Sequence, residues 1–176
     1  DLLERPDWAI ARQKEFNEGV MRIDLFALRE GGTIEGQLIG PLRPELPALE
    51  PGAAYLLETV VRTMKMGHTF TQGTSDSNEV WVELVLKDGE RVVGVSGGRV
   101  GAVDPWSHFV NSYVIDRDGQ RISRRNAQDI FVALYNHQIP PGAADVVHGS
   151  FRVPEDMSGP LTIEARLLYR KFDTTL

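Results

Sequence analysis

The chain has 176 residues, enough for one ordinary domain or two small ones, and a formal net charge of -6. This acidity argues against a nucleic-acid-binding protein, because such proteins use a basic face to displace counterions from phosphates. The chain contains no cysteine, which excludes disulfides, thiolate zinc sites, cysteine nucleophiles and covalently attached haem within it. No apolar run reaches the roughly 18 residues that a transmembrane helix needs.

The N-terminal segment is predicted to contain one helix and two strands. Apolar spacing predicts a short helix over 7–18, with Asp7 capping its first amide groups and Gly19 ending it. The apolar period then changes to two, which predicts a strand over 21–27. A second, weaker strand is expected over 33–39, after a pair of glycines.

A proline-rich stretch suggests a boundary between two parts of the chain. Residues 40–52 contain four prolines, and proline cannot donate the hydrogen bonds that hold a central strand in a sheet. We therefore predict that 1–52 is an N-terminal appendage with a linker and that 53–176 is the main domain.

The main domain is predicted to be all-β, because apolar residues alternate with polar ones along most of it. The predicted strands cover 54–63, 79–87, 91–96, 109–116, 145–153 and 161–171, while 128–135 is ambiguous between strand and short helix. In the second of these, Val80, Val82, Leu84 and Leu86 share one face, and Trp81 lies on the other. About seven strands separated by turns predict an antiparallel, immunoglobulin-like β-sandwich.

Loops longer than a hairpin requires are the expected places for function. They cover 64–78, 97–108 and 136–144. Trp106 follows a proline in the second loop and is predicted to be exposed for contact with a partner. His137 in the third loop and Trp8 in the N-terminal helix complete the predicted partner-binding residues.

The same loops contain possible metal ligands. The candidates are His68, His108, Asp76 and Asp104, because imidazole suits zinc, copper or iron and clustered oxygens suit calcium. No two of the four histidines are closely spaced in the sequence. The competing interpretation to a metal site is therefore that these histidines only form hydrogen bonds with the loop backbone. No serine nucleophile motif or dinucleotide fingerprint is present, and we predict that the chain is not an enzyme.

A series of short motifs, in order over about two thirds of the chain, resembles a known family. They are Gly67-His68-Thr69-Phe70, Gly73-Thr74, Asp76-Ser77-Asn78-Glu79-Val80-Trp81, Val103-Asp104-Pro105 with His108, Asp116-Arg117-Asp118-Gly119, Arg125-Asn126-Ala127, Ile139-Pro140-Pro141-Gly142-Ala143-Ala144, Val147-His148, Val153-Pro154 and Tyr169-Arg170-Lys171-Phe172. The stretch from about Leu57 to Thr174 resembles the cysteine-free C-terminal region of large exported multihaem c-type cytochromes, some of which carry tetratricopeptide repeats. The family usually has Phe-Pro-Gly-Gly-Thr where this chain has Phe70-Thr71-Gln72-Gly73-Thr74.

The resemblance implies a periplasmic or extracellular location and an origin near haem electron-transfer proteins. Because the chain has no haem attachment motif, we expect haem only on a partner. Within this chain we expect no cofactor other than a possible metal ion. The preferred hypothesis is a non-catalytic accessory subunit that docks onto a multihaem cytochrome or a membrane electron-transfer complex, without a transmembrane span of its own. The alternatives are a module that binds a metal or donates a ligand to a neighbouring haem, and a structural subunit of an extracellular filament.

Overall fold

The computed structural model describes residues 6–73, 78–100, 102–122, 126–157 and 159–170, and it is built mainly of antiparallel strands. The elements are α1 (Asp7–Asn17), β1 (Met21–Glu30), β2 (Leu38–Ile39), β3 (Ala54–Thr63), β4 (Glu79–Asp88), β5 (Arg91–Ser96), β6 (Arg99–Val100), β7 (Ala102–Val103), β8 (Ser112–Ile115), the 3₁₀ helix η1 (Ala127–Asp129), β9 (Val132–Asn136), β10 (Ala144–Arg152) and β11 (Leu161–Arg170). Within this described part, no helix is long and apolar enough to cross a membrane.

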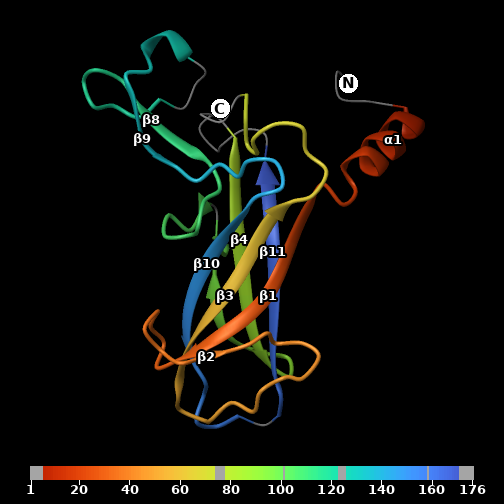
Figure 1. The fold of residues 1–176 in the computed structure, drawn as a ribbon, viewed down its shortest axis with the longest axis vertical. Coiled ribbons are helices and arrows are strands. Elements are labelled where there is room, and N and C mark those ends of the chain that lie inside the picture. The colour runs from red at the N-terminus through yellow and green to blue at the C-terminus, as the bar shows by residue number, and fades with distance from the viewer. Residues whose placement is uncertain (1–5, 74–77, 101, 123–125, 158, 171–176) are drawn as a thin grey trace.

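Two sheets form the body of the molecule (Figure 1). The first has the strand order β10-β3-β1-β2, and the second has the order β11-β4-β5. Apolar side chains of both sheets meet in one core, because each sheet buries the face on which its apolar residues alternate. The predicted all-β sandwich is thereby confirmed, while the immunoglobulin-like arrangement stays a prediction.

β3 and β4 each contribute fully buried side chains to the core. Leu57 and Val61 of β3 are at most 1% exposed, and Val80 and Val82 of β4 are at most 2% exposed. Gly149 of β10 lets the sheets approach closely, since a Cβ there would lie 2.9 Å from a methyl group of the opposing sheet. This face of β4 is the one that the alternation in the sequence predicted.

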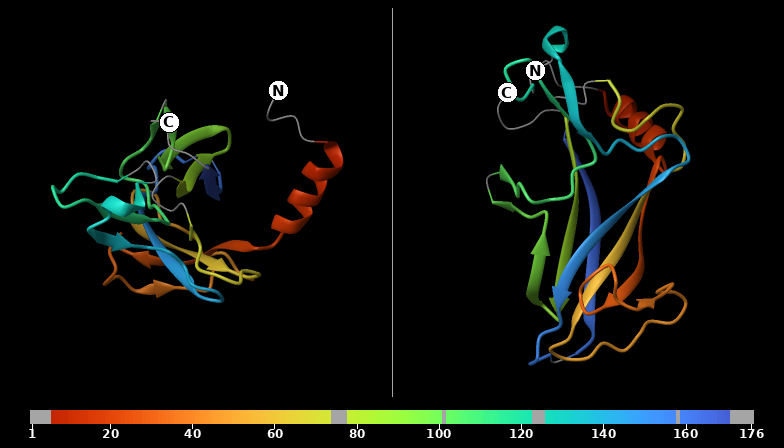
Figure 2. Two further views of the ribbon diagram at one scale, coloured as in Figure 1. Left: turned by 90° about the horizontal axis from the view of Figure 1, so that it is seen from above. Right: turned by 60° about the vertical axis from the view of Figure 1, so that its left-hand side comes forward.

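The predicted N-terminal helix is confirmed as α1, but its predicted cap is wrong. Pro6 occupies the N-cap position, and no side chain caps the helix. Asp7 is instead the first helical residue, where its charge favours the positive end of the helix dipole. No residue of α1 is buried, and Figure 2 shows the helix projecting away from the sheets.

The strand N-terminal to the proline-rich stretch belongs to the main sheet. β1 pairs with β3 from Met21 opposite Thr63 to Glu30 opposite Tyr55, so the sheet spans the boundary that we placed after residue 52. The weaker strand expected over 33–39 shortens to β2, because residues around the paired glycines form turns. The proline-rich stretch contains no strand, as predicted.

Two features differ from the expected loops and strands in the second half of the chain. Residues expected as an irregular loop over 97–108 include the small hairpin β6–β7. The strand expected over 109–116 shortens to β8, although Phe109 forms an isolated bridge with Trp81 of β4. The ambiguous stretch resolves into η1 followed by β9, which pairs with β8.

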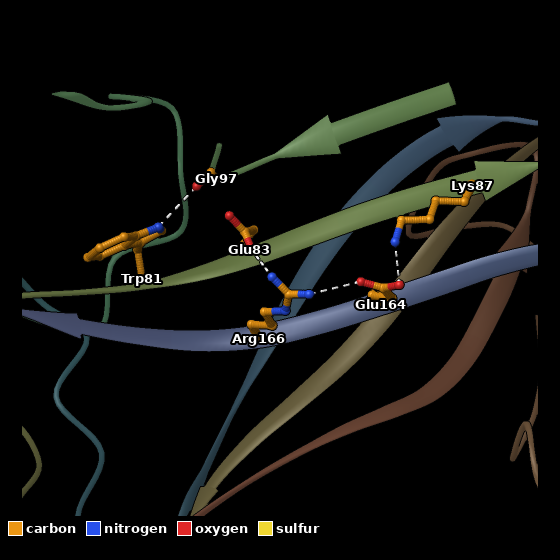
Figure 3. A network of polar contacts seen from close by, with 6 residues as sticks. All are labelled: Trp81, Glu83, Lys87, Gly97, Glu164 and Arg166. Atoms are coloured by element: carbon orange, nitrogen blue, oxygen red, sulfur yellow. Dashed lines mark hydrogen bonds and ion pairs between the residues drawn. The ribbon is translucent and has the colours of Figure 1, made fainter. Parts of the chain in front are cut away.

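Trp81 fixes the segment that follows β5 against the outer face of β4. Its ring is 1% exposed, and its Nε1 donates a hydrogen bond to the carbonyl oxygen of Gly97 at 3.0 Å (Figure 3). A Cβ at Gly97 would lie 2.2 Å from the Val82 oxygen, so only glycine fits there. Trp81 lies on the face of β4 opposite Val80 and Val82, as the alternation predicted, and this face is therefore covered as well.

Alternating charges continue along the same outer face (Figure 3). Arg166 contacts Glu83 at 3.5 Å and Glu164 at 3.1 Å, and Lys87 contacts Glu164 at 2.5 Å. The hydrogen bond from Lys87 holds the pKa of Glu164 below its usual range. These pairs are only partly buried and remain in contact with solvent. Ion pairs at the surface contribute little to stability, but they keep this face polar.

Candidate functional site

Irregular segments gather at one end of the sandwich, which we call the loop end. α1, the loop after β3 and the β8–β9 hairpin lie there, at the top of Figure 1. The opposite end contains the β4–β5 turn, the β10–β11 connection and the proline-rich stretch. The loop end therefore carries two of the three long loops in which the sequence predicted function, the loop after β3 and the loop between β9 and β10.

Two histidines and one aspartate meet at the loop end. Nε2 of His108 lies 2.8 Å from Oδ2 of Asp145, and the rings of His108 and His137 stack with centroids 5.3 Å apart. The potential ligand atoms of all three residues lie within 4.8 Å of one another. We call these three residues the His–Asp cluster.

The backbone positions of the cluster are set by both sheets. The carbonyl of His108 accepts a hydrogen bond from the amide of Val82 in β4 at 3.1 Å. Asp145 is the second residue of β10 and lies opposite Val61 in β3. The cluster therefore joins the first sheet to a segment held by the second sheet.

His137 is held from the β8–β9 side. Its amide donates to the carbonyl of buried Asn111 at 2.9 Å, and its ring packs against Tyr135 with centroids 5.0 Å apart. The Tyr135 hydroxyl also lies 3.5 Å from the Asn111 side-chain oxygen. One buried asparagine thus positions both aromatic residues.

The electrostatics of the cluster favour an ionised carboxylate. The hydrogen bond from His108 holds the pKa of Asp145 below its usual range, although partial burial of the carboxyl acts in the opposite direction. Burial raises the pKa of Tyr135, so this phenol is neutral at physiological pH. Asp145 therefore supplies the negative charge of the cluster.

The predicted metal ligands do not all come together. Among the described residues, the cluster that contains His108 includes neither His68 nor Asp104. His68 is exposed, with its Nδ1 2.9 Å from a neighbouring backbone carbonyl. Asp104 accepts a hydrogen bond from the Trp106 amide and shapes its own loop. Asp76 lies outside the described residues.

Sequence reasoning missed Asp145, which is the carboxylate of the cluster. Asp145 is the first residue of a predicted strand. A charged residue at the end of a strand is ordinarily exposed to solvent, so its charge did not mark it as a ligand. The only signal was its position three residues after Gly142 of the Pro140-Pro141-Gly142 turn, at the end of the predicted loop 136–144.

A groove of about 1010 Å³ lies beside α1, and none of the residues of the His–Asp cluster lines it. Its lining comes from α1, the start of β1, the loop after β3 and the end of β11: Gln13, Phe16, Asn17, Val20, Met21, Arg22, Ile23, Lys65, Met66, Gly67, His68, Phe70, Thr71, Gln72, Asn78, Leu167 and Tyr169. We call this the α1 groove. Phe16 is 79% exposed at its edge, so a large apolar surface faces solvent.

A buried acceptor in the α1 groove has no hydrogen-bond partner. Asn78 is 5% exposed, and its Oδ1 accepts no hydrogen bond within the described part of the chain. An unpaired buried oxygen costs about 1–3 kcal/mol. A ligand with an N–H or O–H group in the groove would recover this energy only if the Asn78 side chain turned its oxygen toward the lining.

The three residues predicted to contact a partner are all exposed. Trp106 is 91% exposed and Trp8 is 70% exposed, and His137 is also exposed. Exposed tryptophans are favourable anchors for association because each one buries a large area in a single contact.

Comparisons with family models, with curated proteins and with solved structures found no match. The resemblance to multihaem cytochromes therefore stays a prediction from the sequence.

Proposed function

We propose that this chain is a non-catalytic β-sandwich that docks onto a multihaem c-type cytochrome or a membrane electron-transfer complex outside the cytoplasm. The observation that carries the docking part is the α1 groove, which combines a wide apolar lining with an unpaired buried acceptor. The haem-carrying nature of the partner and the location rest on the sequence resemblance.

The occupant that fits the groove best is an extended polypeptide segment of the partner. The start of β1 pairs with β3 on one side, and in the described residues no strand pairs with it on the other side. β11 is the edge strand of the second sheet. Edge strands accept an added strand through their free backbone groups.

Such a segment also matches the chemistry of the lining. Its apolar side chains would cover Phe16 and Leu167, and a backbone N–H would pair with the oxygen of Asn78 once that side chain turns toward the groove. Burying apolar surface contributes about 25 cal/mol for each Å². Because α1 contributes to the lining while none of its own residues is buried, contact with a partner would give this helix a packing surface.

The experiment compares two charge substitutions at exposed apolar residues. The chain is used as bait in extracts of its source, and captured protein is tested for c-type haem by its pyridine haemochrome spectrum. Phe16→Glu introduces a charge into the groove, whereas Leu46→Glu changes a residue that is 75% exposed in the proline-rich stretch at the opposite end.

The expected result is haem protein captured by the wild type and by Leu46→Glu, with a loss of at least about tenfold for Phe16→Glu. Equal capture by both variants would show that the groove is not the docking surface. Captured protein without haem would contradict the proposed partner, and no stable partner at all would contradict docking.

A further inference from the structure

We propose that His108, His137 and Asp145 form a binding site for a divalent transition-metal ion. Two imidazoles and one carboxylate are a ligand set that zinc and related ions use in proteins. Calcium and magnesium prefer all-oxygen sites, so they fit this set less well. The site does not depend on the docking partner, because all three ligands come from this chain.

The side chains are already close to binding geometry. Tetrahedral zinc with bonds of about 2.0–2.2 Å places its ligand atoms roughly 3.3–3.6 Å apart. The Nε2 of His108 and the Oδ2 of Asp145 are 2.8 Å apart, and no pair in the set exceeds 4.8 Å. Small side-chain movements, without any change in the strands, therefore bring the three ligands around one ion.

The exposed histidine is the residue that distinguishes a metal site from a simple hydrogen-bonded pair. His108 and Asp145 satisfy each other, but in the described part of the chain the ring of His137 makes no hydrogen bond. It is nevertheless held against His108 by the contacts of Asn111 and Tyr135. A ring with a free nitrogen, fixed beside two other ligands, is positioned to complete the set.

Three ligands from the chain leave at least one coordination position open. Since His137 lies at the surface, this position is accessible to water or to a small anion. A divalent ion with one carboxylate ligand retains a charge of about +1, which favours an anionic fourth ligand. The ion would also link the first sheet to the β8–β9 side of the loop end.

The test is a titration of the full chain, purified without a polyhistidine tag and stripped with a chelator. Zn²⁺ binding is measured by calorimetry, and Co²⁺ binding by its visible absorption, which reports nitrogen and oxygen ligation directly. The variants are His137→Ala, which removes an exposed ring, and Asp145→Asn, which keeps the shape of the carboxylate. His68→Ala is the matched control, because this histidine is also exposed and lies outside the cluster.

We expect one equivalent of metal to bind to the wild type and to His68→Ala. Affinity should fall by more than about tenfold in His137→Ala and in Asp145→Asn. Unfolding in urea verifies that each variant is folded. If Asp145→Asn does not fold, His137→Ala still decides the test, because it changes an exposed residue. No binding at millimolar zinc, or binding that His137→Ala leaves unchanged, would overturn the proposal.

Discussion

Replacing Leu57 with alanine is expected to lower the free energy of unfolding by about 2–5 kcal/mol. Leu57 is 1% exposed and belongs to the core between the two sheets. The substitution removes three carbons, and each buried carbon contributes about 0.8 kcal/mol, which gives about 2.4 kcal/mol. β3 lies between β10 and β1, so its neighbours are poorly able to close the cavity, and the loss should lie in the upper half of the range.

The assay is equilibrium unfolding in urea, followed by tryptophan fluorescence, with Trp81, which is buried on the outer face of β4, as the main reporter of global unfolding. Leu46→Ala is the control, because Leu46 is 75% exposed and its truncation should change stability by less than about 0.5 kcal/mol. A loss below about 1 kcal/mol for Leu57→Ala, or equal losses for both variants, would refute a single core packed between two sheets.

Three further predictions concern the loops and the His–Asp cluster. Gly97→Ala should destabilise the fold more than Gly119→Ala in thermal unfolding: both glycines have positive φ, but only at Gly97 does a Cβ meet backbone. Equal losses of stability in the two variants would contradict the close contact at Gly97. Because the folded-state pKa of Asp145 is lowered, its ionised form stabilises the fold above about pH 4 and that contribution disappears as pH falls through the folded-state pKa. With chelator present, Asp145→Asn should therefore be less stable than wild type at neutral pH, and the difference should shrink in acid; a difference independent of pH would be inconsistent with this. Trp106→Phe should leave stability within about 0.5 kcal/mol while reducing the share of the fluorescence that iodide quenches, with exposed Trp8 supplying the rest. An unchanged share would show that Trp106 is covered.

The strands were predictable where one face is buried, because alternation then records which side meets the core. β4 is the clearest case, since Val80, Val82, Leu84 and Leu86 are buried on the expected face. β3 also has the expected bounds, but it is buried on both faces, so its apolar and β-branched composition identified it rather than alternation. The pairing of β1 with β3 was not predictable in this way, since the proline-rich stretch separates them and local patterns do not specify which strands pair. β8 is shorter than expected because only four of the expected residues pair with β9.

The candidate site was predictable only in pieces. His108 and His137 were both singled out, but for different roles, and Asp145 was not. The contact between His108 and Asp145 joins residues 37 positions apart, and it arises only once the start of β10 lies beside a segment held by β4. The α1 groove likewise depends on the position of α1 relative to two strand edges, which no spacing in the sequence encodes.

The most direct test of docking is a cryo-EM reconstruction of the assembly isolated with the native chain. We predict a haem-carrying partner with an extended segment in the α1 groove, in contact with Phe16 and the edge of β11. A chain isolated without a partner, or an assembly in which this groove faces solvent, would contradict the proposed function.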